Sequence, residues 1–420
     1  MDQVKKTPGP VRAFYPMMIV PGIVLLLAPS TVESIMKYYH FHESMGGLLQ
    51  VAYFTGGVVG ILSITFLIQR YSVRQIAISQ VLLLSVSLLA ASFAPWYPLL
   101  LAFTVVMGIA NGILIAFPGV YVTRTCGDSS HREQNRLYTF FAFGVLAGPI
   151  ITSLLVGNNA ANWRWAFRVP AFLILPLSVP LLVAAFLPLE GVEPLSRKAM
   201  RTVLDFNSGL FYGLFVALLL YIAAESAVSM WLITFLHREH GVSLHGAHWI
   251  LAGLWAGMTV GRWVCGYLSE RIDPFRILVF LTIASGLTLL AAPLFSSKIA
   301  SMVLYPLVGF FYSGIYPFLI GYVAKFPTSV SSGVFTIFVA AGAAGGAVLP
   351  YFVGLINQFA GRVAGMCSIC IPIFGVLCCM YWMKDHVALT DSARVGVADT
   401  EPGQAGNPVE VRGSDKLHLR

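Results

Sequence analysis

Twelve apolar segments divide this chain of 420 residues, and they set the strongest limit on its fold. Each is close to the roughly 20 residues that an α-helix needs to cross a hydrocarbon core. Backbone groups inside a bilayer have no water to bond, so segments of this length predict helices rather than a barrel. The predicted spans are 14–36, 45–69, 75–94, 97–122, 137–157, 165–187, 209–236, 245–269, 275–293, 298–325, 330–357 and 363–383.

The composition agrees with a membrane protein. Hydrophobic residues make up 57% of the chain, charged residues only 10%, and the mean hydropathy is +0.79, whereas soluble domains carry about 25% charged residues. The first segment follows Lys5, Lys6 and Arg12 as a signal peptide would, but it is too long for one, so we expect it to stay uncleaved. The formal charge of +8 is scattered over short loops, which argues against nucleic-acid binding.

An internal repeat relates the two halves of the chain. Residues recur after 201 positions, with Gly56, Gly60, Gln69, Arg70 and Pro149 followed by Gly257, Gly261, Glu270, Arg271 and Pro350. Such a repeat predicts two similar bundles packed face to face in the bilayer. We therefore expect an all-α membrane protein with six-helix bundles at 1–187 and 209–383, a cytoplasmic linker at 188–208 and a disordered tail at 384–420.

The distribution of positive charge predicts the orientation. Of the 26 Lys and Arg residues, nineteen lie at the termini and in even-numbered loops, and six lie in odd-numbered loops. Because positive residues concentrate in cytoplasmic loops, both termini are expected in the cytoplasm.

Several motifs resemble the major facilitator superfamily over about residues 14–383. They include Gly261-Arg262, then Gly266-Tyr267-Leu268-Ser269-Glu270-Arg271 with Arg276, and Trp163-Arg164-Trp165-Ala166-Phe167. Three further stretches are similar to the bacterial fucose permease-like branch, namely Ala224-Glu225-Ser226, Ser313-Gly314-Ile315-Tyr316-Pro317 and Gly345-Gly346-Ala347-Val348-Leu349-Pro350.

The resemblance implies alternating access, a central cavity and proton-coupled sugar uptake across a bacterial inner membrane. The chain departs from the pattern in two ways. Gln69 stands where the family often has an acid, and segments 1 and 4 lack a mid-depth carboxylate, segment 4 offering Asn111 instead. The stretch Gly144-x-x-x-Gly148-Pro149 resembles part of an antiporter signature. An exporter of drugs or metabolites is therefore the alternative within the transport class.

Glu225 is the first candidate for the chemistry of transport. It lies near the centre of the seventh segment, where a carboxylate costs a few kcal/mol unless it is paired, neutral or facing water. Its protonation could be coupled to solute binding. Tyr221 and Ser229 lie one turn away on either side and share its face. On the tenth segment Tyr312 and Tyr316, with Tyr305, form a second polar face that could stack on a sugar, or simply pack.

Asn111, Gln50 and Tyr53 complete the predicted substrate-binding set. The amide of Asn111 could hold a hydroxylated ligand or bond a neighbouring helix. Gln50 and Tyr53 lie nearer the outer end of the second segment and could meet solute entering from outside.

Charged residues at the cytoplasmic helix ends are predicted to form a gate. They are Arg262, Glu270 and Arg271 in the second half and Arg70 and Arg74 in the first. At the outer end, Glu33 has Lys37 one turn on and is interpreted as a surface ion pair.

Other functions are less well supported by the residues. No P-loop is present, and neither the last-segment cysteines nor the outer-loop histidines form a convincing metal set, so we expect no cofactor or metal. A polytopic enzyme would need clustered acids or histidines at one membrane face, and we expect none; a non-transporting sensor stays open. The expected partners are a small solute, protons and lipid. We expect the protein to be a monomer.

Overall fold

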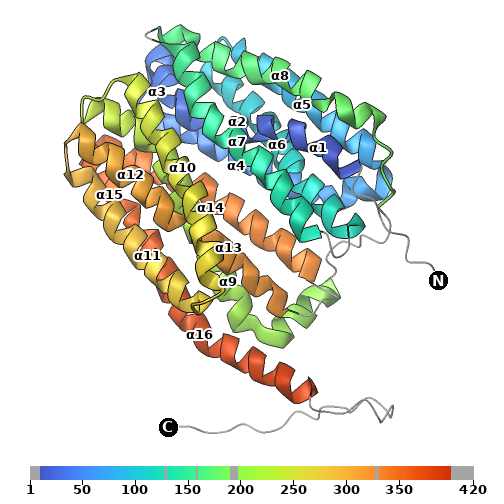
Figure 1. The fold of residues 1–420 in the computed structure, drawn as a ribbon. Coiled ribbons are helices and arrows are strands. Elements are labelled where there is room, and N and C mark those ends of the chain that lie inside the picture. Colours follow the sequence, from blue (N-terminus) through green and yellow to red (C-terminus); the bar gives the residue numbers. More distant parts are fainter. Residues whose placement is uncertain (1–9, 127–129, 158, 190–196, 327–330, 399–420) are drawn as a thin grey trace.

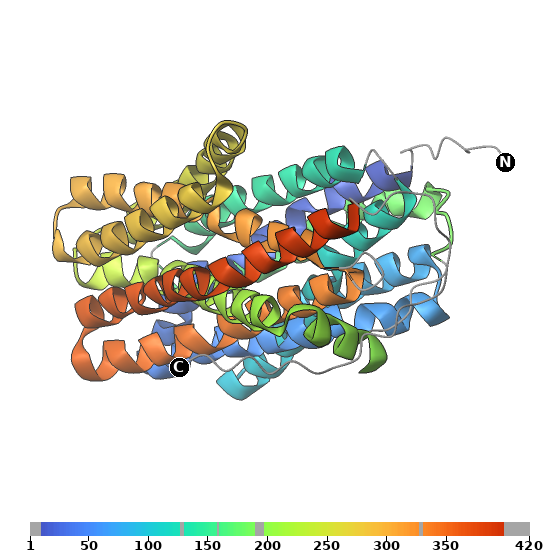
Figure 2. The same ribbon diagram turned by 90° about the horizontal axis from the view of Figure 1, so that it is seen from below.

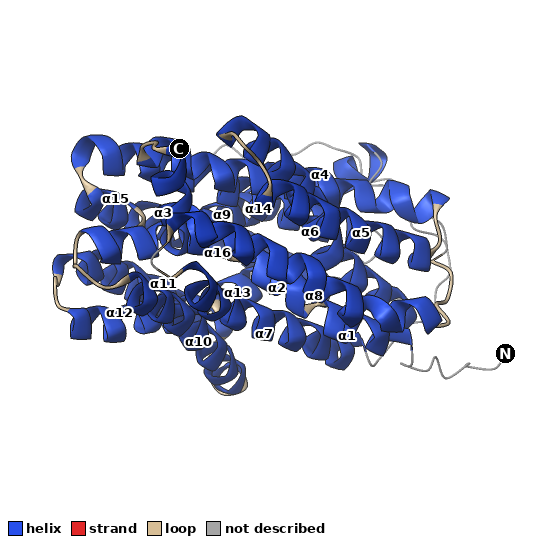
Figure 3. Cartoon of the chain, turned by 90° about the horizontal axis from the view of Figure 1, so that it is seen from above, coloured by secondary structure: helices blue, strands red, loops and turns tan. Residues whose placement is uncertain are grey.

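The computed structural model describes residues 10–126, 130–157, 159–189, 197–326 and 331–398. Throughout these ranges the regular structure is helical (Figure 3). Most of the long helices run side by side (Figure 2), and the start of the described chain lies at the same end of the molecule as the end of the last helix. We call this the terminal end, and the opposite end the far end.

The first half of the chain forms six crossings, drawn blue to green in Figure 1. The first crossing is broken into short helices, as expected of a segment that contains Pro16, Pro21 and Pro29. The elements are η1 (Pro10–Ala13), α1 (Phe14–Met17), α2 (Ile19–Leu25), α3 (Leu27–Tyr39), α4 (Glu43–Arg70), α5 (Val73–Ser92), α6 (Tyr97–Thr125), α7 (Ser130–Val156), η3 (Ala160–Asn162) and α8 (Trp163–Val183).

The second half forms six more crossings. The tenth is interrupted beside Gly314 and the twelfth at Ile369, so each consists of two helices. The elements are α9 (Arg197–Arg238), α10 (Leu244–Ser269), α11 (Pro274–Ala291), η4 (Ala292–Leu294), α12 (Lys298–Tyr312), α13 (Ile315–Gly321), η5 (Tyr322–Lys325), α14 (Ser331–Ala360), α15 (Arg362–Ser368) and α16 (Cys370–Ala398).

Eleven helical segments among the described residues are long and apolar enough to cross a membrane. Helix α10 is the eighth crossing in chain order and is not among the eleven, because His245, His248 and Arg262 lower its hydropathy. It is nevertheless 26 residues long and packs between the halves, against α12 and α7. The all-helical fold with twelve crossings is as predicted.

The expected linker and tail differ from the structure in part. Helix α9 begins at Arg197, inside the expected linker, but its backbone leaves helical geometry at Asn207. There the Asn207 side-chain oxygen accepts a hydrogen bond from the Leu210 amide at 2.9 Å, as an N-cap does. The helical backbone therefore begins again after Asn207, close to the expected start at residue 209, whereas the apolar helical segment as a whole runs from Met200 to Arg238. Helix α16 continues to Ala398, into the expected tail, while 190–196 and 399–420 lie outside the described residues.

Both halves pack their helices in matching pairs. Helix α4 packs on α6 as α10 packs on α12, and α5 packs on α8 as α11 packs on α16. Helix α2 packs on α7 as α9 packs on α14. The two halves meet through α4 with α14, α7 with α10 and α3 with α9.

Close approaches at glycine repeat with the same 201-residue offset. A Cβ atom added at Gly56 would collide with the carbonyl oxygen of Val105, and one at Gly257 with that of Pro306. Small residues let these helix backbones approach closely. The resulting van der Waals packing is one of the interactions that drive helix association in a membrane. Since each glycine and its partner carbonyl are displaced by the same offset, the sequence repeat is also a repeat of contacts.

Candidate functional site

A cavity of about 240 Å³ lies between the two halves of the chain. Helices α2, α4, α6 and α7 form its wall in the first half, and α9, α10, α13 and α14 form its wall in the second. Its polar lining residues are Tyr53, Glu225, Thr259, Arg262 and Tyr316. The lining residues sit at the middle of these helices and on their terminal side, so the cavity is displaced toward the terminal end.

Glu225 is half-buried on the cavity wall and is held from behind by Tyr221. The Tyr221 hydroxyl donates to Glu225 Oε2 at 2.6 Å, and the same hydroxyl lies 3.0 Å from the backbone oxygen of Tyr312. The Tyr221 ring is fully buried and packs edge-on against the Tyr312 ring, with centroids 5.7 Å apart. The predicted face of the seventh segment thus comes together with the predicted face of the tenth.

Arg262 also lies on this wall, which differs from its predicted place in a gate with Glu270 and Arg271. It follows Trp255 and Thr259 at helical spacing, and these three residues of α10 all line the cavity. Its guanidinium donates to the sulfur of Met258 at 3.3 Å and interacts electrostatically with Glu225. The sequence places Arg262 several residues before the end of the predicted helix. Only the packing of α10 shows that its side chain lines the cavity.

Tyr53 lines the cavity, and Asn111 stands behind it. The Asn111 amide donates to the Tyr53 hydroxyl at 2.6 Å and lies 3.3 Å from the backbone oxygen of Pro21. Asn111 is fully buried, so the alternative of a bond between helices describes it better than direct ligand contact. Its amide contacts a cavity tyrosine instead.

The other predicted binding residues are buried outside the cavity lining. Gln50 donates to the Ser226 hydroxyl of the second half at 3.4 Å, and Ser226 donates to the Gly346 carbonyl at 3.1 Å. Ser229 and Tyr312 are buried, and their hydroxyls have no hydrogen-bond partner among the described residues.

A network of five charged residues, which we call the far-end cluster, joins the halves at the far end. Arg238 Nη2 lies 2.9 Å from Glu33 Oε1, and its Nη1 lies 3.4 Å from Glu43 Oε1. Arg362 donates from Nε to Glu43 and from Nη1 to Glu239, both at 2.6 Å. The predicted Glu33–Lys37 pair is therefore wrong, because Arg238 of the other half takes up Glu33.

Sequence reasoning missed the far-end cluster, since its members come from four separate helix ends. The signal that could have found them is that Glu43, Arg238, Glu239 and Arg362 all border odd-numbered loops, where charged residues are few. Tight packing accompanies them: a Cβ atom on Gly47 would lie 2.8 Å from the Tyr351 Cα, and one on Gly354 would lie 2.9 Å from the Glu43 carbonyl oxygen.

Histidines of α10 add two more bonds between the halves on the same side. His248 Nε2 lies 2.9 Å from the Ser30 carbonyl oxygen, and His245 Nδ1 lies 2.7 Å from the Ser153 hydroxyl. Within the described residues, no group of three or more His, Cys, Asp or Glu side chains is placed to hold a metal ion.

The remaining predicted gate residues at the ends of α4 and α10, Arg70, Glu270 and Arg271, are exposed. Arg70 stacks on the Phe66 ring at 4.4 Å, and Arg271 stacks on the Tyr267 ring at 4.6 Å. These two contacts are again 201 residues apart. Glu270 ends α10 as its C-terminal cap residue. Their gating role stays a prediction.

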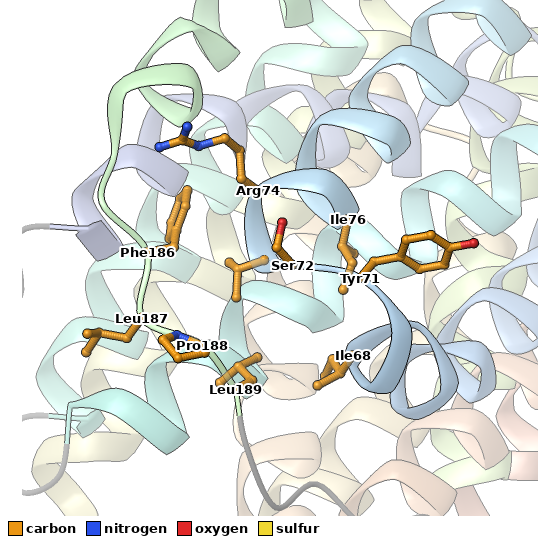
Figure 4. A pocket seen from close by; sticks show the side chains of 10 residues that line it. Ile68, Tyr71, Ser72, Arg74, Ile76, Phe186, Leu187, Pro188 and Leu189 are labelled. Carbon is orange, nitrogen blue, oxygen red and sulfur yellow. The ribbon is translucent and has the colours of Figure 1, made fainter.

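Arg74 lies beside a second cavity, of about 330 Å³, which is confined to the first half. Its guanidinium donates to the Ala184 carbonyl oxygen at 2.7 Å. Figure 4 shows Arg74 and Ser72 at the start of α5 beside Phe186 and Pro188, which belong to the segment that leaves α8. This cavity ties α5 to the chain after α8 and does not reach the second half.

Two matched helical bundles with a cavity between them have the architecture of a secondary transporter. The family model described as Major Facilitator Superfamily matches residues 17–350 and 214–397. The chain belongs to that superfamily.

Two curated relatives cover different amounts of the chain. The glucose/mannose transporter GlcP of Bacillus subtilis (strain 168) is 21% identical over 81% of this chain and 86% of its own length. The protein TsgA homolog of Buchnera aphidicola subsp. Baizongia pistaciae (strain Bp) is 25% identical over 51% of this chain, and the match spans about half of that relative, 54%.

Solved structures share the fold at low identity. A bacterial homolog of the human lysosomal transporter Spinster, inward-facing and unoccupied, has a TM-score of 0.71 and 15% identity, covering 96% of this chain and all of the other. The Escherichia coli fucose:proton symporter FucP (N162A) has a TM-score of 0.64 and 15% identity, covering 89% of this chain and 98% of its own.

Proposed function

We propose that this protein is a proton-coupled secondary transporter of a small, hydroxylated, sugar-like solute. It would work by alternating access in a bacterial inner membrane, with both termini in the cytoplasm. The observation that carries the proposal is a carboxyl group, Glu225, on the wall of a cavity between two matched bundles, hydrogen-bonded to a buried tyrosine.

The chemistry of the cavity suits a sugar-like solute. Its volume of about 240 Å³ is on the scale of one small molecule. Tyr53, Trp255 and Tyr316 provide aromatic faces that can stack on a sugar ring, while Thr259 and the tyrosine hydroxyls can bond its hydroxyl groups. The names of the relatives, a glucose/mannose transporter and a fucose:proton symporter, support the same class.

The bonds around Glu225 accommodate both of its protonation states. When Glu225 is ionised, the Tyr221 hydroxyl donates to the carboxylate. When Glu225 carries a proton, that proton can be donated to Tyr221, whose own hydrogen turns to the Tyr312 carbonyl oxygen 3.0 Å away. A group whose two states are both satisfied can gain and lose a proton in each transport cycle without leaving a buried polar atom unpaired.

Alternating access is supported by the uneven contact between the halves. The ion pairs of the far-end cluster, and the bonds of His245 and His248, join the halves at the far end. The cavity lies on the other side of these bonds, toward the terminal end. With the termini in the cytoplasm, this is a conformation closed to the outside. Opening it requires the far-end cluster to separate while the terminal end closes.

Uptake into proteoliposomes with an imposed pH gradient tests the proposal. The wild-type protein should accumulate a labelled hexose from a panel that includes glucose, mannose and fucose. Glu225→Gln keeps the size and hydrogen bonding of the side chain but cannot release a proton, so gradient-driven accumulation should be lost while exchange of solute continues.

Asp205→Asn is the matched control, because Asp205 is an exposed carboxylate on the same helix, distant from the cavity lining. It should accumulate solute as the wild type does. Unchanged accumulation by Glu225→Gln would remove Glu225 from coupling, and absence of movement of both neutral sugars and sugar acids by the wild type would reject the substrate class.

A further inference from the structure

Arg262 places an unusual cation on the cavity wall. Among the described residues that line the cavity, Arg262 is the one guanidinium and Glu225 the one carboxyl group. The hydrogen-bond partner of Arg262 in the described part of the chain is the Met258 sulfur at 3.3 Å, and a thioether is a weak acceptor. A guanidinium has five N–H donors, so most of its bonding capacity is not taken up by the described contacts of this cavity-lining residue.

Glu225 does not form an ion pair with Arg262 in this conformation. The two groups interact electrostatically, but the Oε2 atom of Glu225 is bonded by Tyr221, and the described contacts include no ion pair of Arg262. A charged side chain inside a membrane protein usually pairs with an opposite charge or marks a solute pathway. The cavity therefore leaves one cation available to its occupant.

We propose that the solute carries a carboxylate, as a sugar acid does, and that Arg262 binds this group. The planar guanidinium matches a carboxylate with two parallel hydrogen bonds, which are stronger than bonds between neutral groups. Tyr53 and Thr259 would bond the hydroxyl groups, and so would Trp255, whose buried Nε1 has no partner among the described residues. This inference rests on the proposed transport function and narrows its substrate class.

Charge balance then gives a physical reason for proton coupling. The groups that face Glu225 are Tyr221 of its own helix, Arg262 of α10, Tyr312 of α12 and Tyr316 of α13. With a proton on Glu225, Arg262 is the charge that remains, and a carboxylate solute neutralises it. When Glu225 loses the proton, its negative charge competes with the solute for Arg262 and favours release. One proton and one anion thus move together without net charge.

Binding of matched sugar pairs to the purified full-length protein tests the inference. Glucose and glucuronate differ at one carbon, where a carboxylate replaces a hydroxymethyl group, and galactose and galacturonate differ in the same way. Calorimetric titration in detergent should show the acid of at least one pair binding at least about tenfold more tightly than its neutral partner, the effect expected of a charged hydrogen bond.

Variants of Arg262 then assign the preference. Arg262→Gln should bind acid and neutral sugar with similar affinity, and Arg262→Lys, which keeps the charge but not the fork, should retain part of the preference. Arg276→Gln is the control, since Arg276 is an exposed arginine at the start of the neighbouring α11, outside the cavity lining. It should behave as the wild type. Melting curves check that each variant is folded. If Arg262→Gln does not fold, the acid preference is measured in Arg262→Lys, where it should be reduced.

The outcomes separate this inference from the transport proposal. If the wild type binds neutral sugars as tightly as the acids, the inference fails while the sugar-like substrate class stands. If it binds neither sugars nor acids, the proposed substrate class fails and the inference fails with it. An acid preference that survives in folded Arg262→Gln and Arg262→Lys would show that another group binds the carboxylate.

Discussion

Glu43 and Arg362 are 319 positions apart in sequence, and the Nε atom of Arg362 donates to Glu43 Oε1 at 2.6 Å. Glu43 begins α4 in the first half and Arg362 begins α15 in the second, so this bond joins the halves at the far end. The same Glu43 oxygen also lies 3.4 Å from Arg238. Glu43 is 5% exposed, and a carboxylate at that depth depends on its partners.

The first prediction concerns this bond. Glu43→Gln removes the charge while keeping the shape, and it should favour the conformation open at the far end by about 1.5–3 kcal/mol, the range of a charged hydrogen bond. That corresponds to roughly a 10- to 150-fold change in the ratio of the two conformations. Distances between spin labels on the far ends of α3 and α9, measured by pulsed electron resonance, report the ratio.

Lys37→Gln provides the control for that measurement. Lys37 lies one turn from Glu33 but outside the far-end cluster, since Arg238 occupies Glu33. Its removal should leave the distance distribution as in the wild type. The two substitutions change the net charge in opposite directions, so an equal shift in both variants would mean that the bond between Glu43 and Arg362 does not set the conformation.

The second prediction concerns the tyrosine behind Glu225. Tyr221→Phe keeps the buried ring but removes the hydroxyl that contacts both Glu225 and the Tyr312 carbonyl oxygen. We expect gradient-driven uptake to fall by about tenfold or more, because a hydrogen bond to a charged group is worth about 1.5–3 kcal/mol. Solute exchange should continue. Initial uptake rates at equal amounts of reconstituted protein measure the effect.

Tyr312→Phe is a matched control on the facing helix. The Tyr312 hydroxyl is buried with no hydrogen-bond partner in the described part of the chain. The atom of Tyr312 that accepts a hydrogen bond from Tyr221 is its backbone oxygen, which the substitution keeps. This variant should transport at a rate close to that of the wild type. A loss as large as that of Tyr221→Phe would show that the hydroxyl of Tyr312 takes part in coupling.

The sequence predicts the helices well because the bilayer fixes their length. A backbone at that depth must bond within its own helix, so apolar segments can be read as crossings. The 201-residue repeat predicts two bundles, and it also relates individual contacts within them. Gly56 approaches Val105 in the first half as Gly257 approaches Pro306 in the second.

The candidate site is less predictable from the sequence, because the position of a residue along a helix does not say which neighbouring helix or cavity its side chain faces. Arg262 could be placed near the terminal end of α10 from its sequence position, but its cavity face depends on how α10 packs between α7 and α12. Glu33 shows the same limit. Its sequence neighbour Lys37 suggested a local pair, yet a residue 205 positions away, Arg238, provides the partner. Contacts between halves are invisible to local patterns.

A third prediction tests whether Asn111 acts through Tyr53. Tyr53→Phe removes a hydroxyl from the cavity wall, and Asn111→Ala removes the amide that donates to it at 2.6 Å. Each should weaken solute binding by about 2- to 12-fold, the size of one neutral hydrogen bond. Because both act on the same contact, the double variant should bind little more weakly than either single variant. Additive losses in calorimetric titration would mean that Asn111 contributes independently.

The last prediction uses the glycine contacts that hold each half together. Gly56→Ala and Gly257→Ala would each place a Cβ atom against a backbone carbonyl oxygen, and backbone cannot rotate away as a side chain can. Overpacking of this kind costs about 1–3 kcal/mol. Each variant should therefore melt at a lower temperature in detergent than the wild type. Gly266→Ala is the control on the same helix as Gly257, because no atom lies within 4 Å of the added Cβ. Since Gly56 and Gly257 occupy equivalent positions in the two halves, their substitutions should lower the melting temperature by similar amounts, and a large effect in one half alone would argue against equivalent packing.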